Sequence, residues 1–437
     1  MDKNKEFLGT EPVGKLLFKL AVPTVIAQLV NMLYNIVDRI YIGHIPEEGS
    51  LALTGVGVCM PIIMIVSAFA ALVSSGGAPR ASIALGEKNS EGAEKILGNC
   101  FSLQIVISVI LTAVLLIFNR PLLLAFGASE NTIEYACDYM NIYALGTIFV
   151  QLTLGMNAFV TAQGYSKIAM LSVVIGAATN IALDPLLIYV FGMGVKGAAL
   201  ATVISQSLST AWVLFFLFSK KAMIRLKAGN MKISAKIILP CLGLGLATFM
   251  MQASESVISV CFNSSLLKYG SDLAVGTMTI LTSIMQFTMM PLMGLSQGAQ
   301  PLLSYNFGAR NAQRVKDAFR CLFIASLACS MFFWIPIQLF PQMFVRIFNN
   351  TPELVEYASH ALRVYMAVSG IFGIQIACQH TFIALGNAKT SLFLAILRKI
   401  LLLIPLIYIL PCFFEDKAFA VFLAEPVADV LAVCTTA

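Results

Sequence analysis

The stretch that decides the fold is ATNIALDPLLIYVFGMGVKGAALATVIS, residues 178–205. It is long and apolar enough to lie in lipid, yet it carries a carboxylate, Asp184, four residues after an amide, Asn180. An ionisable side chain at membrane depth costs about 3 kcal/mol on insertion scales, so it usually faces a bundle interior or an aqueous cavity. Helical spacing puts Asn180 and Asp184 on one face, which we expect to point inward.

The composition of the whole chain is that of a polytopic membrane protein. Of its 437 residues, 59% are apolar and 11% charged, with a mean hydropathy of +0.86, whereas a soluble domain carries about 25% charged residues. The net charge of +6 does not indicate nucleic-acid binding, because the basic residues lie between apolar segments. The ten cysteines form no CxxC pair and read as small hydrophobes. Nucleotide-binding and hydrolase motifs are absent from the sequence, so we expect neither an enzyme nor an ATP-driven pump.

The apolar segments predict twelve membrane-spanning helices, each needing about 20 largely apolar residues. They cover residues 16–43, 52–75, 96–118, 135–162, 168–191, 195–218, 237–267, 273–297, 315–340, 354–385, 390–413 and 418–437. The chain stops inside the last segment, so we expect the natural protein to continue beyond it. Basic residues concentrate in alternate loops, which predicts that both termini are cytoplasmic.

The chain divides into two similar halves. We expect a first six-helix bundle at 1–218, a basic cytoplasmic linker at 219–236 and a second six-helix bundle at 237–437. Matching residues lie 222 positions apart (308 − 86) in the pairs Pro79 and Pro301, Gly86 and Gly308, and Gly164 and Gly386. Because each half has an even number of spans, both enter the membrane from the same side, as in parallel-repeat transporters. Substrate would bind between the halves or within one bundle, with access alternating between the two sides.

Polar stripes run along the first and seventh predicted helices. The first carries Gln28, Asn31, Asn35 and Asp38 on one helical face. Aligning Pro23 with Pro240 places Asp38 opposite Glu255, and the seventh helix repeats the stripe with Thr248, Gln252, Glu255 and Ser259. Each half therefore carries an intramembrane carboxylate at an equivalent position, as a functional group or as a structural one.

Asp184 breaks this symmetry, because the repeat counterparts of Asn180 and Asp184 are leucines, Leu402 and Leu406. Thr202 follows on the next helix at a similar depth. Carboxylate, amide and hydroxyl oxygens suit a small hard cation, and burial favours the protonated form of a carboxylic acid. The sequence thus predicts a cation-coupling cluster of Asp38, Asn180, Asp184 and Thr202. Its possible Na⁺ ligands are Asp38, Asn180 and Asp184, and hydrogen bonds that only join helices remain the alternative.

The second half carries its own polar and polarisable side chains. Arg398 is expected to neutralise Glu255 or to meet an anionic group, and Lys399 to extend to the inner membrane surface. The tenth helix carries Gln375, Gln379 and His380; for His380 we favour a helix-to-helix hydrogen bond over titration. The run at 278–294, which includes Met285 and Met289, suits an adaptable ligand surface or ordinary packing. Other candidate substrate contacts are Gln28, Asn31, Asn35, Asn157, Gln252, Glu255, Gln379 and Arg398.

The chain resembles the multidrug and toxic compound extrusion (MATE) family over nearly its full length, and most closely the MepA-like bacterial branch. The resemblance rests on PTVIAQLVNMLYNIVDRIYIG, TGVGVCMPI, QGYSKIAMLSVVIGAATNIALDPLLIY and GVKGAALATVIS. It implies two six-helix bundles in a V shape that export lipophilic cations in exchange for Na⁺ or H⁺. Functional positions carried over are Asp38, Asn180, Asp184, Thr202 and Glu255. Some members have an acid on the tenth helix where this chain has Gln375, Gln379 and His380, which favours the first-half cluster as the coupling site.

We therefore expect a secondary antiporter of the bacterial inner membrane with a cytoplasmic N-terminus. It would act as a monomer among membrane lipids on small lipophilic cations, with Na⁺ or H⁺ as coupling ion, no other cofactor and no nucleic acid. Two alternatives stay open. A lipid-linked oligosaccharide flippase would use Arg398 and Lys399 to meet a pyrophosphate, and a membrane receptor would bind a ligand without moving it.

Overall fold

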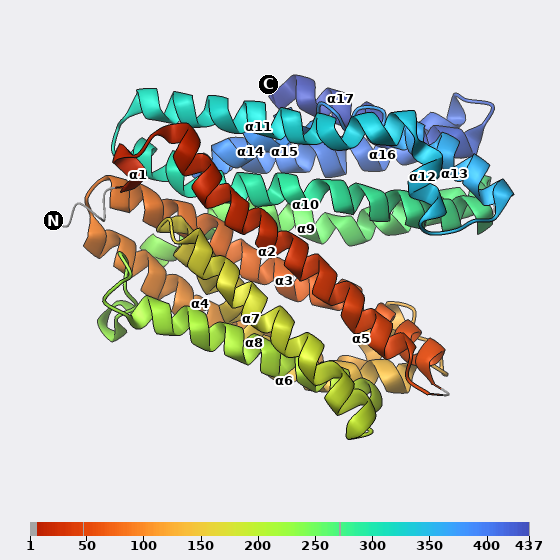
Figure 1. The fold of residues 1–437 in the computed structure, drawn as a ribbon, viewed down its shortest axis with the longest axis horizontal. Coiled ribbons are helices and arrows are strands. Elements are labelled where there is room, and N and C mark those ends of the chain that lie inside the picture. Colours follow the sequence, from red (N-terminus) through yellow and green to blue (C-terminus); the bar gives the residue numbers. More distant parts are fainter. Residues whose placement is uncertain (1–6, 47, 271, 437) are drawn as a thin grey trace.

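The computed structural model describes residues 7–46, 48–270 and 272–436, and each regular element among them is a helix (Figure 1). Residues 1–6 and 437, which the expected bundles include, lie outside the described residues. The first half contains α1 (Phe7–Thr10), α2 (Val13–Gly43), α3 (Gly49–Gly86), α4 (Ser90–Ile117), α5 (Asn119–Ala125), α6 (Ile133–Ala162), α7 (Ser166–Pro185), the π-helical η2 (Leu186–Val190) and α8 (Gly194–Phe218).

The second half follows a short 3₁₀ turn, η3 (Ala228–Asn230). Its helices are α9 (Ala235–Tyr269), α10 (Asp272–Gly308), α11 (Ala312–Leu339), α12 (Pro341–Arg346), α13 (Pro352–Tyr365), α14 (Phe372–Ala384), α15 (Ala388–Ile396), the π-helical η4 (Leu397–Leu403), α16 (Ile404–Ile409), the 3₁₀ turn η5 (Leu410–Cys412) and α17 (Lys417–Thr436). The predicted class, an all-helical membrane fold, is confirmed, since eleven helical stretches among the described residues are long and apolar enough to span a membrane.

The tenth expected span, residues 354–385, is not one helix but is broken between α13 and α14. Helix α11 satisfies the backbone at the break. The Trp334 indole donates to the carbonyl oxygens of Met366 at 3.1 Å and Ala367 at 3.0 Å, and the Ser330 hydroxyl donates to that of Gly370 at 2.6 Å. Backbone groups at membrane depth need partners within the protein. These side-chain bonds therefore permit a discontinuity that hydropathy alone does not indicate.

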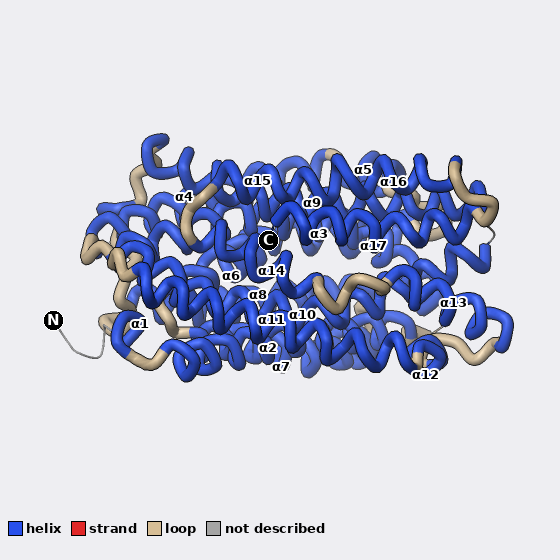
Figure 2. The backbone as a smooth tube through the Cα atoms, turned by 90° about the horizontal axis from the view of Figure 1, so that it is seen from above, coloured by secondary structure: helices blue, strands red, loops and turns tan. Residues whose placement is uncertain are grey.

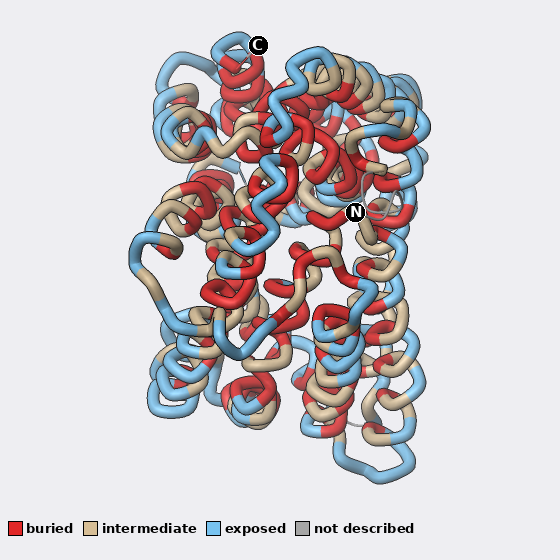
Figure 3. Tube along the Cα trace, turned by 90° about the vertical axis from the view of Figure 1, so that its left-hand side faces the viewer, coloured by how far each residue is buried: buried red, intermediate tan, exposed pale blue. Residues whose placement is uncertain are grey.

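The two halves form a V. In Figure 1 the helices α2–α8 and α9–α17 lie close together at the end that holds α1 and the connection between the halves, and they diverge at the opposite end, near α5, α12 and α13. Figure 2 shows the long helices running roughly along one direction. Figure 3 shows buried residues where helices face one another and exposed residues around the outside.

The internal repeat extends to backbone conformation. Among the described residues, the non-glycine residues with positive φ are Lys88, at 62°, and Arg310, at 56°, which lie 222 positions apart (310 − 88). The next residue in each copy, Asn89 or Asn311, caps the following helix by accepting a hydrogen bond from the backbone N–H three residues on. Asparagine is a preferred N-cap because its side chain satisfies a free N–H of the first turn. Both halves thus use the same turn and cap.

Glycines bring helices of the two halves into backbone contact. A Cβ on Gly76 of α3 would overlap the carbonyl oxygen of Cys241 on α9. A Cβ on the repeat counterpart, Gly298 of α10, would likewise overlap the backbone of Ala21 on α2, although less closely. One turn away, the Thr24 hydroxyl donates to the carbonyl oxygen of Gly294 at 2.5 Å. Small residues at helix crossings are a common basis of membrane helix packing, and here they build the seam between the halves.

The N-terminal helix α1 contacts both halves. The Arg314 guanidinium of α11 donates to the carbonyl oxygens of Leu8 at 3.2 Å and Glu11 at 2.8 Å. On the other side, the Phe7 ring meets that of Tyr165, in the turn between α6 and α7, edge to face with centroids 6.4 Å apart. The segment before α2 therefore lies across the closed end of the V.

The connection between the halves is tied to the first half. The Ser102 hydroxyl of α4 donates to the carbonyl oxygen of Met231 at 2.7 Å, and the Asn99 side chain accepts a hydrogen bond from the Ser234 N–H at 2.7 Å. These bonds fasten the connection to α4.

Replacing Gly76 with alanine should lower the thermal unfolding midpoint, because the new Cβ forces α3 away from α9 and overpacking of this kind costs about 1–3 kcal/mol. The measurement is thermal unfolding of the purified protein. Gly57→Ala is the matched control, since it lies on the same helix with no atom within 4 Å of its added Cβ. Equal midpoints for the two variants would contradict a backbone contact at Gly76.

Candidate functional site

The structure brings together Asn180 and Asp184 of α7 with Thr202 of α8. The Asn180 amide donates to Asp184 Oδ1 at 3.3 Å and, at the longer distance of 3.5 Å, to Thr202 Oγ1. Asn180 and Asp184 are fully buried. The one-turn spacing in the sequence therefore places both side chains inside the bundle.

Asp38 of α2 joins this group, because α2 packs along α7. Its side chain is buried, and its carboxyl group lies near enough to that of Asp184 for the two charges to repel. The phenol groups of Tyr34 and Tyr139 also lie close enough to Asp38 for its charge to act on them. Nothing in the sequence marks these two tyrosines, because neither breaks the apolar pattern of its helix. We call Asp38, Asn180, Asp184 and Thr202 the first-half cluster.

The first-half cluster contains oxygens without hydrogen-bond partners. Among the described residues, Asp38 Oδ1, Asn180 Oδ1 and Asp184 Oδ2 are buried and accept no hydrogen bond. Buried polar atoms are normally satisfied, and a proton or a small cation would satisfy these. The described residues contain no group of three or more His, Cys, Asp or Glu arranged to hold a metal ion. A cation here would therefore need amide or hydroxyl oxygens beside the two carboxylates, and such hard ligands suit Na⁺.

A π-helical segment begins directly after Asp184 and Pro185. Proline has no backbone N–H to donate to the preceding turn, and π-helical turns often occur at functional sites. Helix α8 approaches this segment through Gly197, whose added Cβ would lie 2.8 Å from the carbonyl group of Leu187. This approach sets the depth of Thr202 relative to Asp184.

The other first-half candidates make separate contacts. Gln28 donates to the side-chain oxygen of Gln297 on α10 at 3.0 Å, which joins the two halves. Asn35 donates to the carbonyl oxygen of Asn31 at 2.6 Å, and Asn31 itself is exposed. Asn157 donates to the carbonyl oxygen of Ala169 on α7 at 3.2 Å. Of the polar stripe on α2, Asp38 is the member that meets the first-half cluster.

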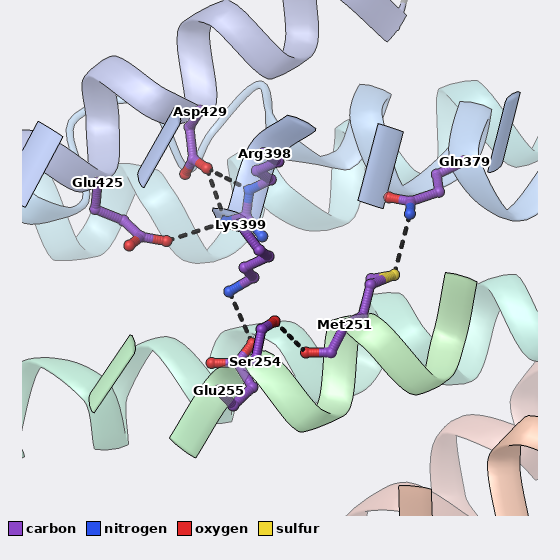
Figure 4. A network of polar contacts seen from close by, with 8 residues as sticks. All are labelled: Met251, Ser254, Glu255, Gln379, Arg398, Lys399, Glu425 and Asp429. Atoms are coloured by element: carbon purple, nitrogen blue, oxygen red, sulfur yellow. Dashed lines mark hydrogen bonds and ion pairs between the residues drawn. The ribbon is translucent and has the colours of Figure 1, made fainter. Parts of the chain in front are cut away.

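A second charged group lies in the second half (Figure 4). Of the two alternatives expected for Arg398, contact with an anionic group holds, since it meets Glu425 and Asp429. Glu255 of α9 pairs with Lys399, with Nζ 2.7 Å from Oε1, and the expectation for Lys399 was wrong. Lys399 does not extend to the membrane surface, because its side chain is 7% exposed and turned toward Glu255.

Arg398 instead pairs with α17. Its Nε donates to Asp429 Oδ1 at 2.7 Å and its Nη2 to Glu425 Oε1 at 3.0 Å. The guanidinium carbon also lies 4.2 Å from the ring centroid of Phe372, a favourable cation–π geometry. We call Glu255, Arg398, Lys399, Glu425 and Asp429 the second-half network.

Sequence reasoning missed Glu425 and Asp429. They lie four residues apart in AEPVAD, within an apolar segment. The rule that singled out Asn180 and Asp184 therefore applies to them as well. Their pairing with Arg398 needed the structure, because the spacing within one helix does not reveal its partner.

The remaining second-half candidates are mostly packing residues. Gln379 donates to the Met251 sulfur at 3.0 Å and accepts from Gln375 at 3.1 Å. The expected hydrogen bond from His380 is not made at its Nε2, which is buried without a partner among the described residues. Met289 and Met285 pack against apolar core residues. Gln252, one turn before Glu255, is exposed.

Replacing Arg398 with methionine should destabilise the protein by about 3–5 kcal/mol, because Glu425 and Asp429 then stay buried without a counter-charge. Chemical or thermal unfolding of the purified protein measures the change. In the control Lys196→Met, the lost pair with Asp138 is exposed, at 54% and 44%, and should contribute only about 0–1 kcal/mol. If Arg398→Met and Lys196→Met lowered the stability by similar amounts, the second-half network would not stabilise the fold.

Two repeated halves of long apolar helices, each with a buried ionisable group, define a parallel-repeat membrane transporter. The sequence matches the family model described as MatE at residues 23–186 and 247–409, once in each half. The chain belongs to the MatE family.

Known relatives agree with this assignment. The chain is 25% identical over 433 residues to the multidrug export protein MepA of Staphylococcus haemolyticus strain JCSC1435, covering 99% of this chain and 95% of that protein. It is also 25% identical over 413 residues to MepA of Staphylococcus aureus strain N315, covering 94% and 90% of the two chains. The resemblance to a MepA-like member of the family is therefore confirmed.

Solved structures share the fold. The MATE multidrug transporter DinF-BH superposes with a TM-score of 0.91 at 34% identity, covering 100% of this chain and 97% of that one. A MATE transporter in the bent conformation superposes with a TM-score of 0.92 at 23% identity, covering 100% and 96%. The protein is thus a multi-pass membrane protein of the MATE fold.

Proposed function

We propose that this protein is an antiporter that exports lipophilic, positively charged compounds in exchange for Na⁺ or H⁺. Family membership supports transport, and the relatives named multidrug export protein MepA support drug-like cargo. The observation that carries the coupling is the set of unpartnered buried oxygens on Asp38, Asn180 and Asp184. A protein that only bound a ligand would not need two buried carboxylates that lack a cation between them.

The orientation of the V supports entry of the cation from outside. Helix α1 and the basic connection at 219–236 lie at the end where the halves meet (Figure 1). Basic loops favour the cytoplasmic side, so this end is the cytoplasmic one and the halves diverge toward the outside. The conformation is then outward-facing, with the cytoplasmic end sealed by the glycine contacts.

Coupling follows from electrostatics between α2 and α7. Two nearby carboxylates repel when both are ionised, and a proton or Na⁺ shared between them removes the repulsion. A bound proton or Na⁺ therefore favours a conformation in which the carboxyl groups of Asp38 and Asp184 stay close. Helix α2 also contacts α10 of the second half through the hydrogen bond from Thr24 to Gly294. A movement of α2 therefore changes the contact between the two halves. The cation biases the conformational equilibrium by binding one state more tightly.

Substrate attraction is assigned to the exposed face of α9. Glu255, whose side chain is 51% exposed, pairs with Lys399, but it is the accessible member of a group in which three acids face two bases. Gln252 lies one turn away on the same helix. This arrangement suits a lipophilic cation better than a neutral compound.

The flippase alternative is weakened by the pairing of the intramembrane cations. Arg398 and Lys399 already hold carboxylates of this chain. A pyrophosphate would have to compete with three acids for them. Transport of a lipophilic cation is therefore the better-supported function.

The variant Asp184→Asn should abolish gradient-driven transport, because an amide cannot take up the coupling charge. The assay is efflux of a fluorescent lipophilic cation from proteoliposomes, with Na⁺ and H⁺ gradients imposed separately. Asp138→Asn makes the same change at an exposed position on α6 and should transport normally. Wild-type rates and unchanged gradient dependence in Asp184→Asn would overturn the coupling assignment.

Glu255→Gln should reduce transport of cationic compounds by about tenfold, the effect of losing about 1.4 kcal/mol of attraction, and should affect neutral compounds far less. Uptake of a matched cationic and neutral pair into proteoliposomes tests this. Glu356→Gln, an exposed acid on α13, controls for loss of charge alone. Equal loss for both compounds would mean that Glu255 has a structural role only.

A further inference from the structure

The second-half network contains more acids than bases. Three carboxylates, on Glu255, Glu425 and Asp429, face two cations, on Arg398 and Lys399 (Figure 4). With every group ionised, the network holds one excess negative charge inside the membrane. Net charge at this depth is costly. The network is therefore one monovalent cation short of neutrality.

The members of the network differ in access and in bonding. The side chains of Arg398, Glu425 and Asp429 are at most 7% exposed, whereas that of Glu255 is 51% exposed. A soluble cation can thus approach the network at Glu255. That carboxylate already holds the ammonium group of Lys399 at 2.7 Å. An arriving cation must share Glu255 with Lys399 or displace it.

The two bases are not equally mobile. Arg398 is fixed by hydrogen bonds to two acids and by the Phe372 ring. Lys399 has one carboxylate partner, a flexible four-carbon stem and a compact charge that can reorient without breaking a bidentate contact. Figure 4 shows Glu425 of α17 in the same group of side chains. Glu425 accepts one hydrogen bond, from Arg398 at 3.0 Å, so it can receive Lys399 when Glu255 is taken.

We propose that Lys399 is a resident cation that a positively charged substrate displaces from Glu255, and that Lys399 then moves to Glu425. This inference rests on the proposed function and adds the residue that sets its specificity. Binding of one monovalent cation brings the network to neutrality. A neutral compound displaces nothing, and a divalent cation leaves an excess positive charge. Lys399 thereby selects monovalent cations.

Equilibrium binding to the purified protein tests the displacement. The probes are tetraphenylphosphonium, a lipophilic monovalent cation, and triphenylphosphine oxide, a neutral compound of related shape. In Lys399→Met the competing ammonium is absent, so tetraphenylphosphonium should bind about tenfold more tightly, the size of one lost competing charge pair. Binding of triphenylphosphine oxide should not change. A variant that leaves tetraphenylphosphonium binding unchanged or weaker, or that changes both probes equally, would overturn the proposal.

Two further variants keep the test decisive if Lys399→Met folds poorly. Lys399→Arg retains the competing charge and should not bind tetraphenylphosphonium more tightly than the wild type. Glu425→Gln removes the group that receives Lys399 and should weaken tetraphenylphosphonium while sparing the neutral probe. Because Glu425 is buried, with 2% of its surface exposed, such a charge-selective loss would not arise from a packing role. Equal losses for both probes in Glu425→Gln would contradict the relocation of Lys399.

Glu255→Gln separates the two proposals. If it leaves tetraphenylphosphonium binding intact, the assignment of Glu255 to cationic substrates fails, and displacement of Lys399 fails with it. If it weakens tetraphenylphosphonium while Lys399→Met gives no gain, only the role of Lys399 is overturned.

Discussion

The structure depends on one constraint: within a membrane, each polar group needs a partner inside the protein. The break between α13 and α14 exists because Trp334 and Ser330 supply the missing hydrogen bonds. Arg398 can lie inside the bundle because α17 provides Glu425 and Asp429. Asp38 and Asp184 keep buried oxygens without hydrogen-bond partners, and our proposal is that an ion from outside the chain completes the structure there.

The two halves share a backbone plan but differ in their charges. Both use the same capped turn and the same glycine contacts at the seam. The first half encloses acids without a basic partner, which suits a mobile inorganic cation or a proton. The second half encloses acids that already hold bases, and its one accessible acid suits a larger organic cation. In the proposed antiporter, the coupling ion and the cationic substrate move in opposite directions. A duplicated fold can place the site for each of them in a different half.

Much of this organisation could be predicted from the sequence. Apolar length predicts the spans, the 222-residue offset predicts the repeat, and the spacing of Asn180 and Asp184 predicts a shared buried face. Glu425 and Asp429 were missed although their spacing within an apolar segment is a visible signal, and the rest of what escaped prediction involves contacts between distant helices. Nothing near residues 366–371 indicates that Trp334 will satisfy their carbonyl groups. Likewise, the choice of Lys399 over Arg398 as the partner of Glu255 depends on the direction in which each side chain leaves η4, which a sequence pattern does not encode.

The central claim is that the coupling cation binds in the first half. The most direct test is binding of radioactive sodium to the purified protein, together with proton release on binding, compared between the wild type and variants that disable each half in turn. The account predicts that cation binding disappears when Asp38 and Asp184 are both replaced by asparagine, and that it persists when Glu425 and Asp429 are replaced by their amides. Binding that survives the first change and is lost with the second would contradict it.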